Sequence, residues 1–255
     1  MLRSITESPH LHSTVALVTG ASSGIGEATA LALAAQGATV ALVARRGERL
    51  EALAARIGAQ AFAIAADLTD PAAPPRVIEE VVARAGRLDI LVNNAGLMLL
   101  GPIEGAPLSE WERMIDLNVR ALVHCAHAAL PHLLEAASQG PRNVADMVNV
   151  SSVAGRLARN GSGVYNLTKW GVGAFSESLR QEVTARHVRV GLVEPGATES
   201  ELVEQNRPEI INALSLGAMQ RMASADIADA IIYMVTRPRH VAVNEILIRP
   251  TEQER

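Results

Sequence analysis

The fold is decided by residues 14–46, which read TVALVTGASSGIGEATALALAAQGATVALVARR. Two apolar runs, at 14–19 and 38–44, flank a stretch from Gly24 to Gln36 in which small and apolar residues recur at helical spacing. An apolar run without polar alternation is typical of a strand that is buried on both faces. A glycine-rich turn joins the first run to the helical stretch. The pattern therefore predicts a strand, a helix and a second, parallel strand.

The same alternation continues along the rest of the chain. Further buried strands are predicted at 61–65, 88–92, 147–150, 188–193 and 245–248, and helices at 47–57, 109–137, 162–185 and 225–236. Strands that alternate with helices predict a parallel sheet with helices on both faces. We therefore expect one Rossmann-like domain over 1–255, a doubly wound parallel α/β sheet of about seven strands, preceded by an N-terminal extension at 1–13.

Composition limits the class of protein. The net charge is -4 without any block of like charges, so neither a nucleic-acid partner nor a membrane partner is expected. Cys125 is the one cysteine, which excludes an internal disulfide, and no Cys/His spacing suggests a metal site. Residues 1–13 carry charges and lack an apolar core, and no apolar run has transmembrane length. A cytoplasmic enzyme is the resulting expectation.

Residues 19–26, TGASSGIG, form the turn between the first predicted strand and helix. Its glycines permit close approach of a pyrophosphate, and the helix N-terminus offers free N–H groups and a positive dipole end. The spacing is neither GxGxxG nor a P-loop. A glycine-rich turn alone also fits a plain strand–helix connection, but its place after a strand and before a helix favours dinucleotide binding.

Residues 19–26 also resemble the TGxxxGxG cofactor loop of the short-chain dehydrogenases/reductases of the classical type. Other motifs of that family follow in order at predicted strand ends: Asn93-Asn94-Ala95-Gly96, Ser151-Ser152, Tyr165-Asn166-Leu167-Thr168-Lys169 and Pro195-Gly196. The resemblance covers about 14–248, nearly the whole chain. It implies an oxidoreductase that transfers a hydride between a nicotinamide cofactor and a carbonyl or alcohol.

The residues after the second strand indicate which nicotinamide cofactor binds. NAD sites of this type usually carry an acid there for the ribose 2′-hydroxyl. Here the position is Ala44, followed by Arg45 and Arg46. A guanidinium can bind a 2′-phosphate, although two solvated arginines at a helix start also fit the pattern. We predict NADP(H), with Arg45 as the stronger candidate.

The resemblance implies a full cofactor site and a lid. Its residues are Gly20, Ser22, Ser23, Gly24, Ile25, Gly26, Arg45, Arg46, Asp67, Leu68, Asn94, Ala95, Gly96, Tyr165, Lys169, Pro195, Gly196 and Thr198, with Asn93 also lining the cleft. The family usually has a threonine where this chain has Ser200, so Thr198 is a second hydroxyl candidate. The implied substrate lid spans about 196–220, and its polar-then-apolar pattern fits either a mobile lid or a fixed surface helix.

Tyr165 and Lys169 are four residues apart on a predicted helix and therefore share one face. A nearby ammonium favours the phenolate and should lower the pKa of Tyr165 below its usual value of about 10. Such pairs are common on surfaces, and the added weight comes from Ser152 at a strand end. The resemblance implies a catalytic Ser152/Tyr165/Lys169 set in which Tyr165 is the general acid/base. It adds Asn118, which would help hold a water that links Lys169 to solvent; a helix distortion explains Asn118 nearly as well.

The resemblance implies a substrate wall whose residues in this chain are mostly apolar. They are Leu97, Met98, Val153, Ala154, Asn160 and Leu202. This mixture favours a neutral or mostly apolar carbonyl, although Arg156 and Arg159 could instead meet a carboxylate or remain solvated. The stretches 98–104 and 245–251 resemble the branch that holds small 3-hydroxy-acid dehydrogenases and clavulanate-type aldehyde reductases.

Assembly and a rival function complete the expectations. The family resemblance implies a homo-oligomer, either a tetramer or a dimer, that acts on a small-molecule carbonyl or alcohol. The rival is a catalytically inactive NADP-binding sensor or scaffold. A broken Ser/Tyr/Lys set would favour that rival, but the set is intact in this sequence.

Overall fold

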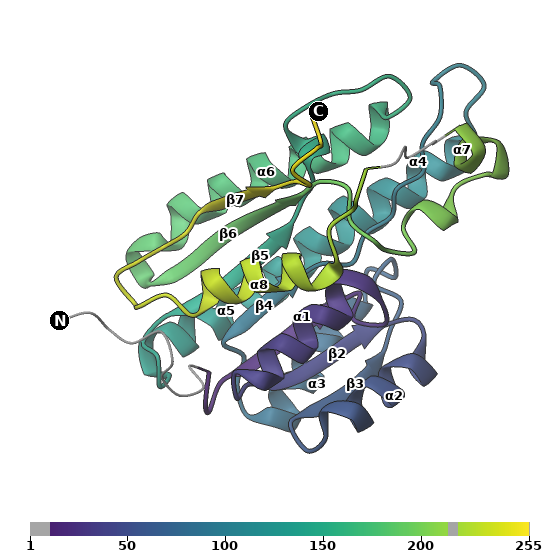
Figure 1. Cartoon of the computed structure of the whole chain (residues 1–255). Helices are drawn as coiled ribbons and strands as arrows, with labels where there is room; N and C mark the ends of the chain where they lie inside the picture. Colours follow the sequence, from purple (N-terminus) through teal and green to yellow (C-terminus); the bar gives the residue numbers. More distant parts are fainter. Residues whose placement is uncertain (1–10, 214–218, 255) are drawn as a thin grey trace.

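The computed structural model describes residues 11–213 and 219–254, which form a seven-stranded sheet (Figure 1). All strand pairs are parallel, in the order β3-β2-β1-β4-β5-β6-β7. The strands are β1 (Val15–Thr19), β2 (Thr39–Ala44), β3 (Ala61–Ala65), β4 (Ile90–Asn93), β5 (Ala145–Val150), β6 (Val188–Pro195) and β7 (Glu245–Ile248). The predicted doubly wound parallel sheet is confirmed.

Helices cover both faces of the sheet (Figure 1). They are α1 (Gly24–Ala35), α2 (Gly47–Ile57), α3 (Ala73–Ala85), α4 (Leu108–Ile115), α5 (Leu122–Gln139), α6 (Gly163–Val183), α7 (Pro208–Ala213) and α8 (Ser224–Val235). The first core joins one sheet face to α3, α5 and α6, and the second joins the other face to α1, α2 and α8. Within β1, Leu17 belongs to the first core and Ala16 and Val18 to the second, as the two-residue period of a strand requires.

The strand order reverses beside β1, which pairs with β2 on one side and with β4 on the other. In such sheets the connections that leave the two strands diverge, and a crevice opens at their carboxyl ends. Helix α1 begins at that edge, directly after the glycine turn that follows β1. The fold therefore places the turn at 19–26 at the site where parallel sheets of this kind bind ligands.

Several predicted boundaries differ from the structure by one or two residues, among them those of β4, which spans 90–93 instead of 88–92, and β6, which extends to 195. Two further differences have a visible cause. Strand β5 begins at Ala145, before the predicted start at residue 147, because Asp146 pairs with Arg142 and Arg189 at 2.7 Å each and is thereby buried. The helix predicted at 109–137 is three pieces, since a π-helix at Asp116–Ala121 separates α4 from α5. Such π segments often mark functional sites.

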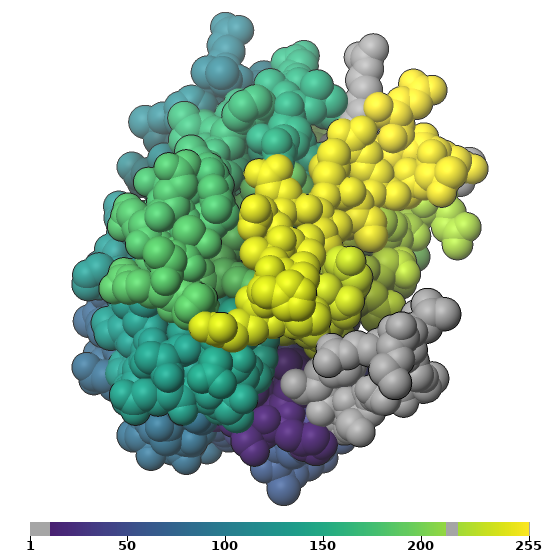
Figure 2. All heavy atoms as spheres, turned by 90° about the vertical axis from the view of Figure 1, so that its left-hand side faces the viewer, coloured from purple at the N-terminus to yellow at the C-terminus, as the bar shows by residue number. Residues whose placement is uncertain are grey.

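The end of the chain lies near the carboxyl end of β6, on the side of the sheet where the cavity-lining loops begin. Strand β7 forms the outer edge beside β6, and the last residues lie on the face shown in Figure 2. The backbone N–H of Gly196 donates to the Ile248 carbonyl at 2.8 Å, and the N–H of Ala197 donates to Gln253 Oε1 at 2.8 Å. The C-terminal segment thus supports the loop that follows β6.

Three further observations concern the predicted segments. Residues 1–10 of the predicted N-terminal extension lie outside the described residues, whereas Leu11 is buried in the second core. Residues 214–218 of the predicted lid also lie outside them. Within the described ranges, no helix is both long enough and apolar enough to span a bilayer.

Candidate active site

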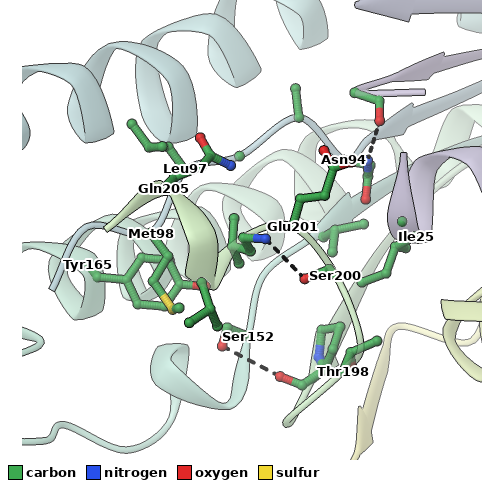
Figure 3. A pocket seen from close by; sticks show the side chains of 18 of the residues that line it. Ile25, Asn94, Leu97, Met98, Ser152, Tyr165, Thr198, Ser200, Glu201 and Gln205 are labelled. Atoms are coloured by element: carbon green, nitrogen blue, oxygen red, sulfur yellow. Dashed lines mark hydrogen bonds between the residues drawn. The ribbon is translucent and has the colours of Figure 1, made fainter. Parts of the chain in front are cut away.

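A cavity of about 710 Å³ opens at the carboxyl ends of the strands. Figure 3 shows its two ends: Tyr165, Met98 and Ser152 lie together at one end, and Ile25 and Asn94 at the other. Every residue of the implied cofactor site lines this cavity except Asn93 and Gly26, which are both buried. Ser152, Tyr165 and Lys169 line the cavity too, whereas Asn118 does not.

The turn after β1 depends on glycine at two kinds of position. Gly20 and Gly24 have φ angles of 67° and 58°, a region that L side chains rarely adopt. Gly26 has no room for a side chain, since a Cβ there would lie 2.3 Å from the Gly20 carbonyl oxygen. These constraints hold the turn tightly against the start of α1, whose first N–H groups have no partner within the helix.

The loop that follows β4 is hydrogen-bonded to the last residue of β1, at the start of the same turn. Thr19 Oγ1 accepts hydrogen bonds from the backbone N–H groups of Asn94 and Ala95, both at 3.0 Å, and Asn94 Nδ2 donates to the Thr19 carbonyl at 2.9 Å. Asn93 was expected to line the cleft, and that expectation is wrong. Its side chain is buried and donates to Asn149 Oδ1 at 2.9 Å, so Asn93 joins β4 to β5 below the cavity.

Arg46 is bound to the turn by its guanidinium group. Its Nε and Nη2 donate to Ser22 Oγ at 3.1 and 2.9 Å, and Nη2 also donates to Ser23 Oγ at 2.7 Å. Arg45 also lines the cavity. Near it the pKa of Asp67 is lowered: burial raises this pKa, but hydrogen bonds from Thr69 and, to a smaller extent, the charge of Arg45 outweigh that effect. Of the two arginines, Arg46 is therefore the one that the structure brings to the serines of the turn.

The phenol of Tyr165 is buried on α6 beside Ser152 at the end of β5. Burial raises its pKa from 10.0 to about 12, and a side-chain hydrogen bond with Ser152 offsets part of that rise. Ser152 Oγ in turn accepts a hydrogen bond from the Ala154 N–H at 3.1 Å, which orients the hydroxyl. A phenol with a pKa raised to this level holds its proton at neutral pH.

Lys169 lies one turn along α6 from Tyr165, with Nζ 5.9 Å from the centre of the phenol ring. Its Nζ donates to the Val150 carbonyl at 2.9 Å. Burial lowers the pKa of Lys169 from 10.5 to about 8. The expected net lowering of the Tyr165 pKa is not found, because burial raises this pKa and the hydrogen bond with Ser152 offsets only part of the rise.

The pKa of Lys169 should be visible in the pH dependence of stability, because it is the only lysine in the chain. Its folded pKa of about 8 is below its ordinary 10.5, so between these values the unfolded chain holds more protons. The free energy of unfolding should therefore rise through this window, by on the order of 3 kcal/mol relative to Lys169→Met. Urea titrations of both proteins from about pH 7 to about pH 10 measure the difference.

A difference between the two proteins that stays flat with pH would contradict a lowered Lys169 pKa. Lys169→Arg provides the control, since an arginine keeps its charge throughout this range. Above about pH 10 the curve should turn downward in both proteins. There the folded chain retains the Tyr165 proton, whose pKa is raised to about 12, while the unfolded chain loses it.

Asn118 lies in the π-helix and acts on the β4 loop. Its Oδ1 accepts from the Leu97 N–H at 2.7 Å, and its Nδ2 donates to the Leu97 carbonyl at 2.8 Å and to Thr168 Oγ1 at 3.2 Å. The side chain is 1% exposed. The helix distortion expected at Asn118 is present, and the side chain positions the loop after β4. Its expected role in holding a water beside Lys169 stays a prediction.

Comparison with known proteins places this arrangement in a family. The sequence profile described as short chain dehydrogenase matches residues 14–211. The chain belongs to the short-chain dehydrogenase family. It is similar to an uncharacterized oxidoreductase of Staphylococcus epidermidis, with 35% identity over 92% of this chain and 96% of that protein. This short-chain dehydrogenase is accordingly an oxidoreductase.

Solved structures agree with this membership. A serine dehydrogenase in its closed form, complexed with NADP+, superposes with a TM-score of 0.87 at 32% identity, over 95% of this chain and 97% of that one. A 3-ketoacyl-(acyl-carrier-protein) reductase from Brucella melitensis, complexed with NADH, gives a TM-score of 0.83 at 28% identity, over 94% and 98%.

The short-chain dehydrogenase site contains supporting residues that the sequence analysis missed. Asn166 Nδ2 donates to the carbonyls of Ala154 and Leu157 at 2.7 and 2.9 Å, which fixes the loop between Ser152 and α6. Asn206 Oδ1 accepts from the Leu100 N–H at 2.7 Å. Asn166 lies inside the Tyr165–Lys169 motif, so that motif could have drawn attention to it. Nothing in the sequence around Asn206 identifies its partner 106 residues away.

The expected substrate wall is present in most of its members. Leu97, Met98, Val153, Ala154 and Leu202 all line the cavity. Asn160 does not; it lines a separate, open surface hollow.

The two candidate cations differ. Arg156 pairs with Glu194 and Glu245 and is not a cavity residue, whereas Arg159 lines the cavity. Among the described residues there is no group of three or more His, Cys, Asp or Glu side chains that could hold a metal ion.

Proposed function

We propose that this short-chain dehydrogenase is an NADP(H)-dependent oxidoreductase that transfers a hydride between the nicotinamide and a carbonyl carbon or an alcohol. The observation that carries the proposal is one cavity with two chemically distinct ends. The end at Ser22, Ser23 and Arg46 suits a phosphorylated nucleotide, and the end at Ser152 and Tyr165 suits a carbonyl oxygen.

The residues present fit the cofactor. The turn at 19–26 excludes side chains where a pyrophosphate would approach, and α1 directs its N-terminus there. Arg46 supplies a guanidinium for a 2′-phosphate, and no acid stands at Ala44 to repel it. Among related structures, NADP+ is bound by the serine dehydrogenase and NADH by the 3-ketoacyl reductase, so the arginine carries the choice of NADP(H).

The bound cofactor supplies the hydride acceptor or donor. The phenol of Tyr165, with its pKa raised to about 12, keeps its proton at neutral pH and can donate it to a substrate oxygen as negative charge develops there. Ser152 holds that oxygen beside the phenol. Lys169 places its ammonium nearby and is held by the Val150 carbonyl. In alcohol oxidation the same groups act in reverse.

The cavity wall supports a neutral or mostly apolar carbonyl as substrate, because Leu97 and Met98 pack with Tyr165 and Leu202 also lines the cavity. We also propose a homo-oligomer, a dimer or a tetramer. Leu167 and Trp170 on α6 support this, since they are 62% and 51% exposed. The sensor alternative has no supporting feature among the described residues.

The test is the loss of reduced-nicotinamide absorbance with a panel of small aldehydes and ketones, run with NADPH and with NADH. We expect turnover with NADPH and a much lower kcat/KM with NADH. Clear binding of NADPH together with no turnover on any member of a broad panel would favour the sensor. Equal kcat/KM for the two cofactors would contradict the NADP(H) assignment.

A further inference from the structure

In the segment after β6, Glu201 forms ion pairs with two arginines that follow β2, Arg46 and Arg49. Glu201 Oε2 accepts from Arg46 Nη1 at 2.6 Å, and Glu201 Oε1 accepts from Arg49 Nη1 at 2.6 Å. The residues concerned are more than 150 positions apart in the chain. The ion pairs therefore join the start of the expected lid to the beginning of α2.

This contact is part of the cofactor end of the cavity. Arg46 and Glu201 both line the cavity, whereas Arg49 lies outside it. The neighbouring Ser200 lies close to the glycine turn, since a Cβ built on Gly24 would lie 3.4 Å from the Ser200 Cβ. Figure 3 shows Ser200 and Glu201 between the Ile25 end and the Tyr165 end of the cavity.

The carboxylate of Glu201 can bind the Arg46 guanidinium in the same way as a phosphate group would. A guanidinium binds carboxylates and phosphates through the same N–H groups. Hydrogen bonds from Arg49 and Arg46 lower the pKa of Glu201 to about 2, so the carboxylate is charged at physiological pH. With Nε and Nη2 of Arg46 directed at Ser22 and Ser23, the Nη1 edge is the one that Glu201 occupies.

A second contact on the same segment differs from this one. Asn206 attaches the far part of the segment to the substrate side through the backbone groups of Met98 and Leu100, at 2.9 and 2.7 Å. That attachment involves no charged group. Only the Glu201 contact uses a group that the phosphorylated nucleotide would also bind.

We propose that Glu201 is an internal anion of the 2′-phosphate site, bound to Arg46 in the free protein and released from it when a 2′-phosphate binds there. This inference rests on the proposed NADP(H) cofactor and adds a consequence for specificity. Glu201 keeps Arg49 after release, so the segment at 199–202 remains near α2 but loses one of its two ion pairs. A nucleotide without the 2′-phosphate leaves both pairs in place.

Binding of two nucleotide fragments tests the competition directly. The fragments are adenosine 2′,5′-bisphosphate, which carries the 2′-phosphate, and adenosine 5′-monophosphate, which lacks it. Calorimetric titration of Glu201→Gln should show about fivefold tighter binding of the bisphosphate and unchanged binding of the monophosphate. Glu199→Gln is the matched control. The substitution removes the same charge from the same segment, and Glu199 itself is exposed and does not line the cavity. It should bind both fragments as the wild type does.

Hydrogen exchange gives a readout that does not depend on catalysis. The bisphosphate should raise the exchange rate of the backbone amides at 199–202 in the wild type, where the Glu199 N–H donates to the Met222 carbonyl at 2.9 Å. The monophosphate should leave that rate unchanged. In Glu201→Gln the rate should already be raised in the free protein and should not respond further to the bisphosphate.

The possible outcomes separate this inference from the proposed function. Unchanged or weaker bisphosphate binding by Glu201→Gln would overturn the inference, since Glu201 would then be neutral toward Arg46 or would position it. Equal affinity of the wild type for the two fragments would overturn both the inference and the choice of NADP(H). A normal fragment response without any carbonyl turnover would support the inference and contradict only the proposed reaction.

Discussion

Replacing Tyr165 by phenylalanine is expected to lower kcat by about 10³-fold while NADPH affinity stays within about twofold of the wild type. The variant keeps the buried ring in its place on α6 and removes only the hydroxyl that can give a proton to the substrate oxygen. Single-turnover and steady-state rates with the best carbonyl of the panel, together with an NADPH binding titration, measure the two quantities separately.

The chain provides a matched control for this variant. Its other tyrosine, Tyr233, lies on α8, is 51% exposed and has the Arg237 guanidinium 4.2 Å from its ring centre. Tyr233→Phe removes the same hydroxyl from a residue outside the cavity and should leave turnover unchanged. Wild-type turnover in Tyr165→Phe would show that another group protonates the substrate oxygen.

Replacing Arg46 by glutamine is expected to weaken NADPH binding by about 10- to 100-fold and to change NADH binding little. The guanidinium is already held beside the turn by Ser22 and Ser23, so a 2′-phosphate would meet a positioned cation. Its side chain is 43% exposed, so solvent screening favours the lower part of that range. Fluorescence titration with both reduced cofactors measures the change in selectivity.

The neighbouring Arg45 provides the comparison that decides which arginine binds the 2′-phosphate. Arg45→Gln removes an equal charge from the same cavity, but Arg45 has no described hydrogen bond to either serine of the turn. We expect a smaller loss of NADPH affinity than in Arg46→Gln. The opposite order of effects would return the principal role to Arg45, the residue that the sequence alone favours.

The sequence predicts the sheet and the turn because both depend on local patterns. Buried parallel strands need continuous apolar runs such as 38–44, and the turn needs glycine where φ is positive or where a Cβ would collide, as at Gly26. Strand ends in a parallel sheet also share one edge. Residues placed after different strands, Ser152 among them, could therefore be expected in one cavity before any contact was known.

The sequence does not predict the partners of polar side chains that meet only in the folded chain. Asn118 binds the backbone of Leu97, Asn206 binds that of Leu100, and Arg46 contacts Ser23 of the turn. The same holds for the pKa of Tyr165. Its shift depends on the sum of burial and neighbouring charge, and burial is a property of the packed structure.

The sequence by itself determined the family, the doubly wound sheet and most of the residues that line the cavity, because spacing and residue type suffice for periodic strands, helices and glycine turns. Only the tertiary structure decided that Arg46 is the guanidinium on the turn and that Glu201 occupies its free edge. The physical reason is the short distance over which hydrogen bonds and ion pairs form. A hydrogen bond or an ion pair depends on positions to within a few tenths of an ångström, and only the complete packing of the chain sets distances between residues so far apart in sequence.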